Sequence, residues 1–121
     1  MKRLNVSLAA ALVLVAAASL STIRAVAQTP AVTDDNLSES IANAKTPADH
    51  EAIATYYDQE AADADKKAAL HRRSASIVKP VGMANMCSGL AKYWEKVSGQ
   101  DKELANAHRK MAKAAGSETG H

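Results

Sequence analysis

Histidine, cysteine and methionine are the residues of this sequence whose side chains offer the most distinctive chemistry. They include His50, His71, Cys87 and His108, and Met111 follows His108 by three positions. Imidazole, thiolate and thioether groups form a soft ligand set that suits copper, and a His/Met pair also serves as the axial ligands of haem iron. These residue types favour a bound copper ion or haem as the first hypothesis for function.

A repeat of 37 residues relates these positions to one another. The shift puts His71 in register with His108, and it puts His50 in register with Cys87, which exchanges one ligand type for another. Such self-similarity at a fixed spacing indicates an internal duplication of one helical unit. Further matches are Tyr56 with Tyr93, Tyr57 with Trp94, Asp58 with Glu95, and Arg72 with Arg109.

A strong helix start precedes the first copy of the repeat. Thr46 can cap the helix with its side chain, Pro47 suits the first helical position, and Asp49 lies in the first turn, where a negative charge is favourable. No helix-breaking residue follows until Pro80, so we expect one helix over residues 47–78.

A second long helix is expected after a turn. Pro80 and Gly82 interrupt the helical pattern, and residues 83–115 resume it. A turn over residues 79–84 lets the second helix return antiparallel to the first. The sequence therefore predicts an all-α fold, in which residues 46–115 form a helical hairpin domain.

Small residues recur every seven positions in both helices and predict the surface on which the helices meet. A period of 3.5 residues with one small position per heptad suits closely packed antiparallel helices. Two such helices leave part of their surface unburied, so a homodimeric four-helix bundle is the expected assembly. The small positions are Ala54, Ala61, Ala68 and Ala75, then Ala91, Ser98, Ala105 and Ala112; a row of larger residues beside them contains His50, Tyr57, Ala64 and His71, then Cys87, Trp94, Asp101 and His108.

The antiparallel arrangement predicts two clusters of candidate ligands, one at the open end of the hairpin and one near its turn, about 30 Å apart by helix rise. The alternative interpretation is structural, because a histidine between helices often forms a polar layer that fixes register, and Met commonly fills gaps in a core. The first cluster contains His50, His108 and Met111, and the second contains His71, Cys87, Met83 and Met86.

Aromatic and charged residues have simpler interpretations. The acids and lysines of residues 58–67 are expected to form a solvated face. No Glu-x-x-His pair lies on the helix seam, which excludes a ferritin-like di-iron oxidase. Packing in the core is expected for the aromatic residues, with the wall of a cofactor pocket as the alternative. These residues are Tyr56, Tyr57, Tyr93 and Trp94.

Cys87 is the single cysteine of the chain. In an exported protein three roles are open to it: an intermolecular disulfide, a metal ligand, or a buried inert thiol. The sequence contains no C-x-x-C-H motif, which excludes the usual two-thioether attachment of haem and leaves attachment through one cysteine open.

Residues 1–27 are typical of a secretory signal peptide. A basic start precedes an apolar run of about fifteen residues, which is shorter than the roughly 20 that span a bilayer, and Ala25-Val26-Ala27 supplies a small-x-small cleavage pattern. We expect cleavage after Ala27, a periplasmic or secreted location, and no stable membrane insertion of the mature chain. Three of the 15 Lys and Arg residues lie in this segment, so the mature chain has 12 against 13 Asp and Glu, and nucleic-acid binding is not expected.

The mature chain should be one small domain with weakly structured ends. Residues 28–45 are polar, with one short helix expected behind a cap at Asp34 or Asp35, and residues 116–121 are expected to be a disordered tail. The chain has no Phe and one Trp, and Ala dominates its apolar residues. Such a small core usually needs a staple, a metal or a partner subunit.

One motif occurs in both halves of the hairpin: (His/Cys)-x-x-(Ile/Leu)-Ala-x-Tyr-aromatic, followed later by His-Arg. In this motif, over residues 50–111, the chain resembles a group of small exported bacterial helical proteins. The resemblance implies a helical hairpin and adds no particular function. Similar chains carry His-x-x-Met in both halves, whereas here Ser74 stands where the first Met would be, which weakens a site centred on His71.

No catalytic motif is present, so we expect a binding protein rather than an enzyme. The first hypothesis is an exported helical-bundle protein that binds copper or haem through His50, His71, Cys87 and His108, with Met111 as a further metal ligand. The alternative is a structural or protein-interaction dimer without a cofactor. A membrane-surface role is disfavoured, because the mature chain lacks bulky apolar residues and a basic face.

Overall fold

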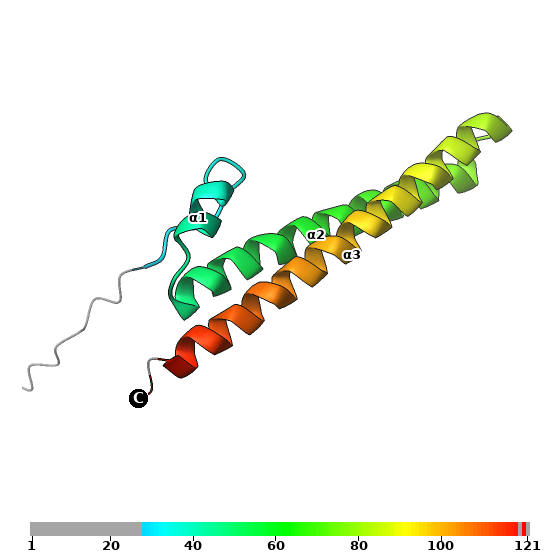
Figure 1. Cartoon of the computed structure of the whole chain (residues 1–121). Coiled ribbons are helices and arrows are strands. Elements are labelled where there is room, and N and C mark those ends of the chain that lie inside the picture. Colours follow the sequence, from blue (N-terminus) through cyan, green and yellow to red (C-terminus); the bar gives the residue numbers. More distant parts are fainter. Residues whose placement is uncertain (1–27, 119, 121) are drawn as a thin grey trace, which may run out of the picture.

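The computed structural model describes residues 28–118 and 120, and the predicted signal peptide lies outside them. The described residues form α1 (Leu37–Asn43), α2 (Pro47–Ile77) and α3 (Val81–Glu118). α2 and α3 pack against each other as an antiparallel hairpin, and α1 contacts only α2. Figure 1 shows the two long helices side by side, with α1 next to the start of α2. The predicted all-α hairpin is confirmed.

A capping box starts α2, as the sequence predicts. The hydroxyl of Thr46 accepts a hydrogen bond from the backbone N–H of Asp49 (3.2 Å), and the Asp49 carboxylate accepts one from the backbone N–H of Thr46 (2.9 Å). Asp49 also accepts from the backbone N–H of Lys45 (3.0 Å). These donors, Lys45 first and Thr46 second, lower the pKa of Asp49. The box fixes the helical turn that carries His50.

The turn between the long helices is shorter than the sequence predicts. Only residues 78–80 connect α2 to α3. Gly82, which the sequence places in a turn over residues 79–84, lies in the first turn of α3, and the backbone N–H of Ala84 donates to the carbonyl of Pro80 (3.0 Å). The first turn of a helix has no intrahelical acceptors for its N–H groups, so Pro80 and Gly82 cost few hydrogen bonds there.

α3 ends later than the sequence predicts. A tail is expected from residue 116, whereas α3 continues to Glu118. Gly116 lies against the start of α2, since a β-carbon at this position would be 3.6 Å from Cγ of Pro47. The start of α2 therefore supports the last turn of α3.

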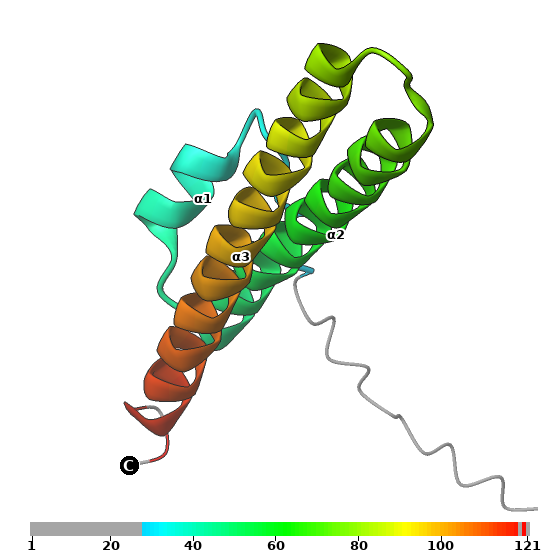
Figure 2. The same ribbon diagram turned by 90° about the vertical axis from the view of Figure 1, so that its right-hand side faces the viewer.

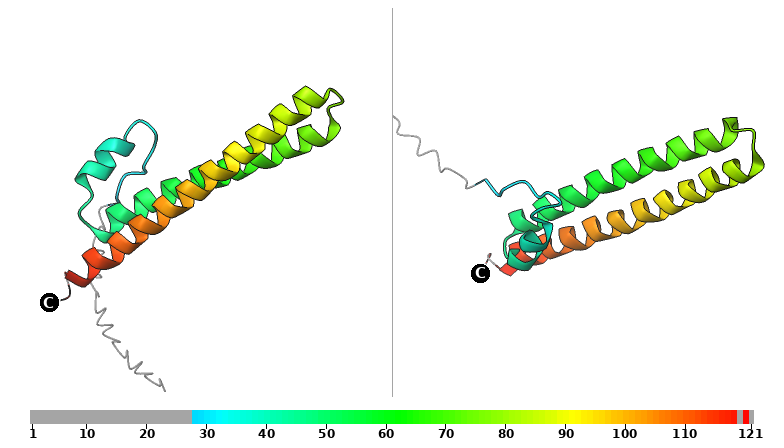
Figure 3. Two further views of the ribbon diagram at one scale, coloured as in Figure 1. Left: turned by 45° about the vertical axis from the view of Figure 1, so that its right-hand side comes forward. Right: turned by 90° about the horizontal axis from the view of Figure 1, so that it is seen from above.

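α1 confirms the expected short N-terminal helix but has a different residue at its cap. Asn36, rather than Asp34 or Asp35, precedes the first helical residue, and its Oδ1 accepts a hydrogen bond from the backbone N–H of Thr33 (2.8 Å). Asp34 instead accepts a hydrogen bond from the hydroxyl of Tyr56 on α2 (2.9 Å). This bond ties the segment before α1 to one side of the hairpin, and Figures 2 and 3 show α1 beside the long helices.

The core is a line of small residues between α2 and α3. Ile53 is the largest apolar side chain that is fully buried in the described part of the chain. Because alanine contributes little apolar area, the hydrophobic stabilisation of this hairpin is small for its length. The buried small residues are Ala54, Ala61, Ala64 and Ala68 on α2, and Ala91, Ser98, Ala105 and Ala112 on α3.

Three ion pairs, one heptad apart, join α2 to α3. They are Asp58 with Arg109, Asp65 with Lys102 and Arg72 with Glu95. Under the 37-residue shift the first pair maps onto the third, and the central pair maps onto itself. Asp58 and Asp65 are solvated, as predicted, and in addition reach across to α3, which the sequence prediction did not include. Each exposed pair contributes only about 0–1 kcal/mol, but all three favour the same register of α2 against α3.

Candidate functional site

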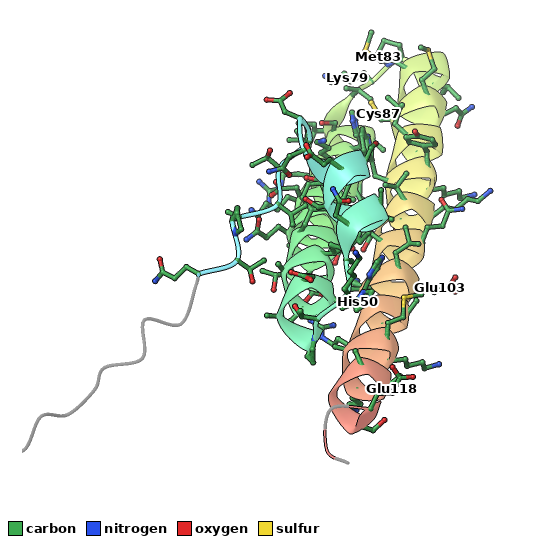
Figure 4. All side chains as sticks on the ribbon, turned by 60° about the vertical axis from the view of Figure 1, so that its left-hand side comes forward. His50, Lys79, Met83, Cys87, Glu103 and Glu118 are labelled. Carbon is green, nitrogen blue, oxygen red and sulfur yellow. The ribbon has the colours of Figure 1, made fainter. Side chains whose placement is uncertain are left out.

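The open end of the hairpin brings His50 of α2 and His108 of α3 together, as the antiparallel register predicts. Their Nδ1 atoms are 3.2 Å apart, and their ring centroids are 5.5 Å apart. At this distance the N–H of one Nδ1 donates a hydrogen bond to the other Nδ1, so at least one of the two imidazoles carries no proton on Nδ1. Figure 4 labels His50 beside α1 at the face where the two long helices meet.

The surroundings of His108 favour its neutral form. The His108 side chain is 7% exposed, and the ring of Tyr57 stacks on it with centroids 6.1 Å apart and an interplanar angle of 25°. Burial, followed by the nearby His50, lowers the pKa of His108 below its usual 6.5. Neutral imidazole is also the form that can bind a metal ion.

Neighbouring contacts hold both histidines in place. His50 follows Asp49, whose carboxylate is fixed in the capping box of α2. His108 precedes Arg109, which is ion-paired with Asp58 across the hairpin. Both histidines therefore come from regular helix, next to residues that fix each helix locally.

Met111 is the remaining predicted ligand at this end. It lies about one turn after His108 on α3, and its side chain is 48% exposed. Residues three apart on a helix project from the same side, so its thioether can approach the imidazole pair. Within residues 28–118 and 120, no group of three or more His, Cys, Asp and Glu side chains could hold a metal ion. The candidate ligands that the sequence places at this end are therefore two imidazoles and one thioether.

The second predicted cluster is not assembled in the same way. His71 and Cys87 are half-buried, and in the described part of the chain neither makes a hydrogen bond or ring contact with the other. Met83 and Met86 are 53% and 70% exposed. In Figure 4, Met83 and Cys87 lie at the turn end of the hairpin, far from His50.

The aromatic residues divide between the site and the surface. Tyr57 packs on His108, whereas Tyr93 is 57% exposed, so the prediction of core packing is wrong for Tyr93. Trp94 is half-buried, and the ammonium of Lys67 lies 4.2 Å from the centroid of its ring. This cation–π contact covers part of the Trp94 ring in the middle of the hairpin.

Asp101 is a half-buried carboxylate of α3 that the sequence analysis did not name as a functional candidate. It lies one heptad before His108 in the same row of α3, and burial raises the pKa of its carboxyl group. Its place in the row of larger residues was the available signal. A carboxylate in a row otherwise made of His, Trp and Cys is unusual for a packing position.

Comparisons with protein-family models, with curated proteins and with solved structures find no match to this chain. Among residues 28–118 and 120, no helix is long and apolar enough to cross a membrane. The geometry of the His50–His108 pair is therefore the main guide to function.

Proposed function

We propose that this chain is an exported, non-enzymatic helical hairpin protein that binds a copper ion through His50 and His108, with Met111 as a third ligand. The observation that carries the proposal is the 3.2 Å distance between the two Nδ1 atoms. Two nitrogens that each lie about 2.0–2.1 Å from one metal ion at a tetrahedral angle are about 3.3 Å apart. A metal ion could therefore replace the hydrogen-bonding proton, which would pass to solvent or to a ring Nε2, once each ring turns to aim its Nδ1 lone pair at the ion.

The same distance favours a single ion over haem. Two axial histidines on opposite sides of a haem iron have ligand atoms about 4 Å apart, with the porphyrin plane between them. Nitrogens 3.2 Å apart leave no room for that plane. A thioether beside two imidazoles is a soft set, which suits Cu(I) better than the hard cations that prefer carboxylates.

The role that suits this site is binding, storage or delivery of the ion. Tyr57 covers the ring of His108, while the side chain of Met111, about one turn further along α3, is 48% exposed. A site with one covered side and one open side lets an ion enter and leave without unfolding the hairpin. The duplication gives the turn end an equivalent His71 and Cys87, but the proposal does not depend on them.

The test is a Cu(I) titration of the purified mature protein in competition with a chromophoric Cu(I) chelator. We expect one copper per chain for the wild type. His50→Gln and His108→Gln each remove one imidazole and should weaken Cu(I) binding by about tenfold or more. Loss of a residue that only hydrogen-bonds to a metal ligand already lowers metal affinity by about that factor, so loss of a ligand itself should cost at least as much. Met111→Leu should weaken it less.

His71→Gln is the matched control, because His71 is equivalent to His108 in the repeat and has no imidazole partner in the described structure. It should bind copper like the wild type. Helix content by circular dichroism checks that each variant is folded. Wild-type protein that is folded and binds no Cu(I) would contradict the proposal and support the alternative of a structural module without a cofactor.

A further inference from the structure

An exposed apolar stripe runs along α3 on the side that α2 does not cover. Six of its side chains are large and 43–70% exposed: Met83, Met86, Leu90, Tyr93, Leu104 and Met111. Val97 and Ala107, both half-buried, and Gln100 complete the stripe. We call these nine residues the outer stripe.

The outer stripe has the pattern of a helix–helix contact. Its residues alternate in steps of three and four along the whole of α3, which is the a/d spacing of a coiled coil. From Met83 to Met111 it is about 42 Å long, and its six large side chains expose on the order of 600 Å². Two such stripes facing each other would bury about 1,200 Å², which reaches the range of specific interfaces.

The equivalent position in the first half of the hairpin is already covered. Ile53 is 1% exposed, whereas its partner in the 37-residue repeat, Leu90, is 43% exposed. α1 packs on α2, and no helix of the described chain packs on the outer face of α3. The face around Leu90 therefore lacks the cover that the corresponding face of α2 has.

We propose that the outer stripe binds a second copy of this chain, with the two α3 helices antiparallel about a twofold axis level with the Ser98–Gly99 bond. In this register Val97 faces Gln100 of the second copy, and Tyr93 faces Leu104 of the second copy. A shallow hollow on α3, lined by residues that include Gln100, Leu104 and Ala107, lies where that Tyr93 ring packs.

Charges beside the stripe select this register. The row that flanks the stripe on the side away from α2 contains Lys96 and Glu103, both exposed. The proposed axis brings Lys96 of each copy next to Glu103 of the other, which forms two symmetric ion pairs. This complementarity within one sequence is what identifies the occupant as a second copy.

Neighbouring registers are unfavourable. A shift of one heptad in one direction places Glu103 opposite Glu103 of the second copy, and the opposite shift places Lys96 opposite Lys96. Like charges at these places disfavour both alternatives. The charge-reversal test is separate from copper binding, since neither Lys96 nor Glu103 is a proposed ligand; Met111 is the one residue that the two proposals share.

The proposed axis also separates the two cysteines. Cys87 lies more than eleven residues from the axis level, so the two Cys87 thiols are about 35 Å apart along the paired helices. A disulfide between them cannot form in this dimer, because bridged Cα atoms must lie within about 7 Å.

Sedimentation of the mature protein over a range of concentrations, with charge-reversal variants, tests the proposal. Lys96→Glu and Glu103→Lys should each weaken the dimer by about tenfold or more, because each places like charges together twice. The double variant restores opposite charges and should return the dissociation constant to within about threefold of the wild type. Neither residue is buried, so both variants should fold.

Two further variants separate the stripe from other contacts. Leu104→Glu should abolish the dimer, whereas Leu70→Glu, at a 57% exposed position on α2, should leave it unchanged. Cys87→Ser should also leave it unchanged. A wild type that stays monomeric at high concentration would overturn the proposal, as would a double charge variant that is no tighter than the single ones, or a dimer lost in Cys87→Ser.

Discussion

At the scale of single residues, the His50–His108 contact makes proton binding and stability interdependent. Burial and the neighbouring His50 lower the pKa of His108 in the folded chain, while in the unfolded chain it has its ordinary value of 6.5. The unfolded state therefore binds more protons between these two pKa values. By linkage, the neutral His108 stabilises the fold fully above about pH 6.5, and this contribution is lost as the pH falls through the lowered pKa.

We predict that the free energy of unfolding, measured by urea titration, falls as the pH decreases from about 7.5 to 5. In His108→Gln this decrease should be smaller, because the residue can no longer gain a proton. His71→Gln is the control and should keep the wild-type decrease. Carboxylates with lowered pKa values, such as Asp49, take up protons and lower the free energy of unfolding only at still lower pH. All three proteins contain them, so they do not affect the comparison. An equal decrease in wild type and His108→Gln would contradict the role given to His108.

Residue types and spacing were enough to predict the His50–His108 contact, because helix periodicity and an antiparallel return bring these two positions together whatever the details of the turn. The same argument fails for His71 and Cys87. The register lets both lie near the turn, but whether their side chains meet depends on how closely the helices approach there. The distance between two side chains at the turn depends on how the helices pack there, and residue spacing in the sequence does not determine that packing.

At the scale of helices, local signals predicted starts better than ends. The start of α2 was predictable because Thr46 and Asp49 satisfy each other's backbone N–H groups within four residues. The late end of α3 was not, because Gly116 is supported by Pro47, a residue far away in the sequence. Likewise Asp58 reaches Arg109 across the hairpin, whereas its neighbours along the chain suggested only a solvated face.

Gly99 is a helix position at which glycine serves no visible packing purpose. α3 continues through it without interruption, and a β-carbon there would have nothing within 4 Å. We predict that Gly99→Ala stabilises the protein by about 0.5–1 kcal/mol, because alanine loses less backbone entropy in a helix. Urea unfolding measures the change.

The repeat supplies the matched control for this substitution. Ala62 on α2 is the equivalent of Gly99, and it too is exposed. Ala62→Gly should therefore destabilise the protein by about the amount that Gly99→Ala stabilises it. A destabilising Gly99→Ala would show that the glycine is needed for a bend or a contact in α3.

At the scale of the whole molecule, a long hairpin with an alanine core needs additional contacts. The buried residues of the described chain are mostly alanines, while the large apolar side chains of α3 remain at the surface. The proposed dimer buries those side chains and would place Met86 of the second copy opposite Met111. In that arrangement each copper site would gain a neighbouring thioether from the other copy, so the two proposals would reinforce each other without depending on each other.

Mass action then connects stability to protein concentration. If the folded chain is mainly a dimer, unfolding separates two chains, and the melting temperature rises with total concentration. For a domain of this size we expect an increase of about 5–10 °C between about 1 and 100 µM, measured by circular dichroism or calorimetry without added copper. Leu104→Glu, which removes the contact that Tyr93 of the second copy makes in the outer stripe, should melt at a lower temperature that does not change with concentration. A wild-type melting temperature that is constant over this range would mean that the hairpin is stable alone, and that its exposed stripe on α3 contributes nothing to folding.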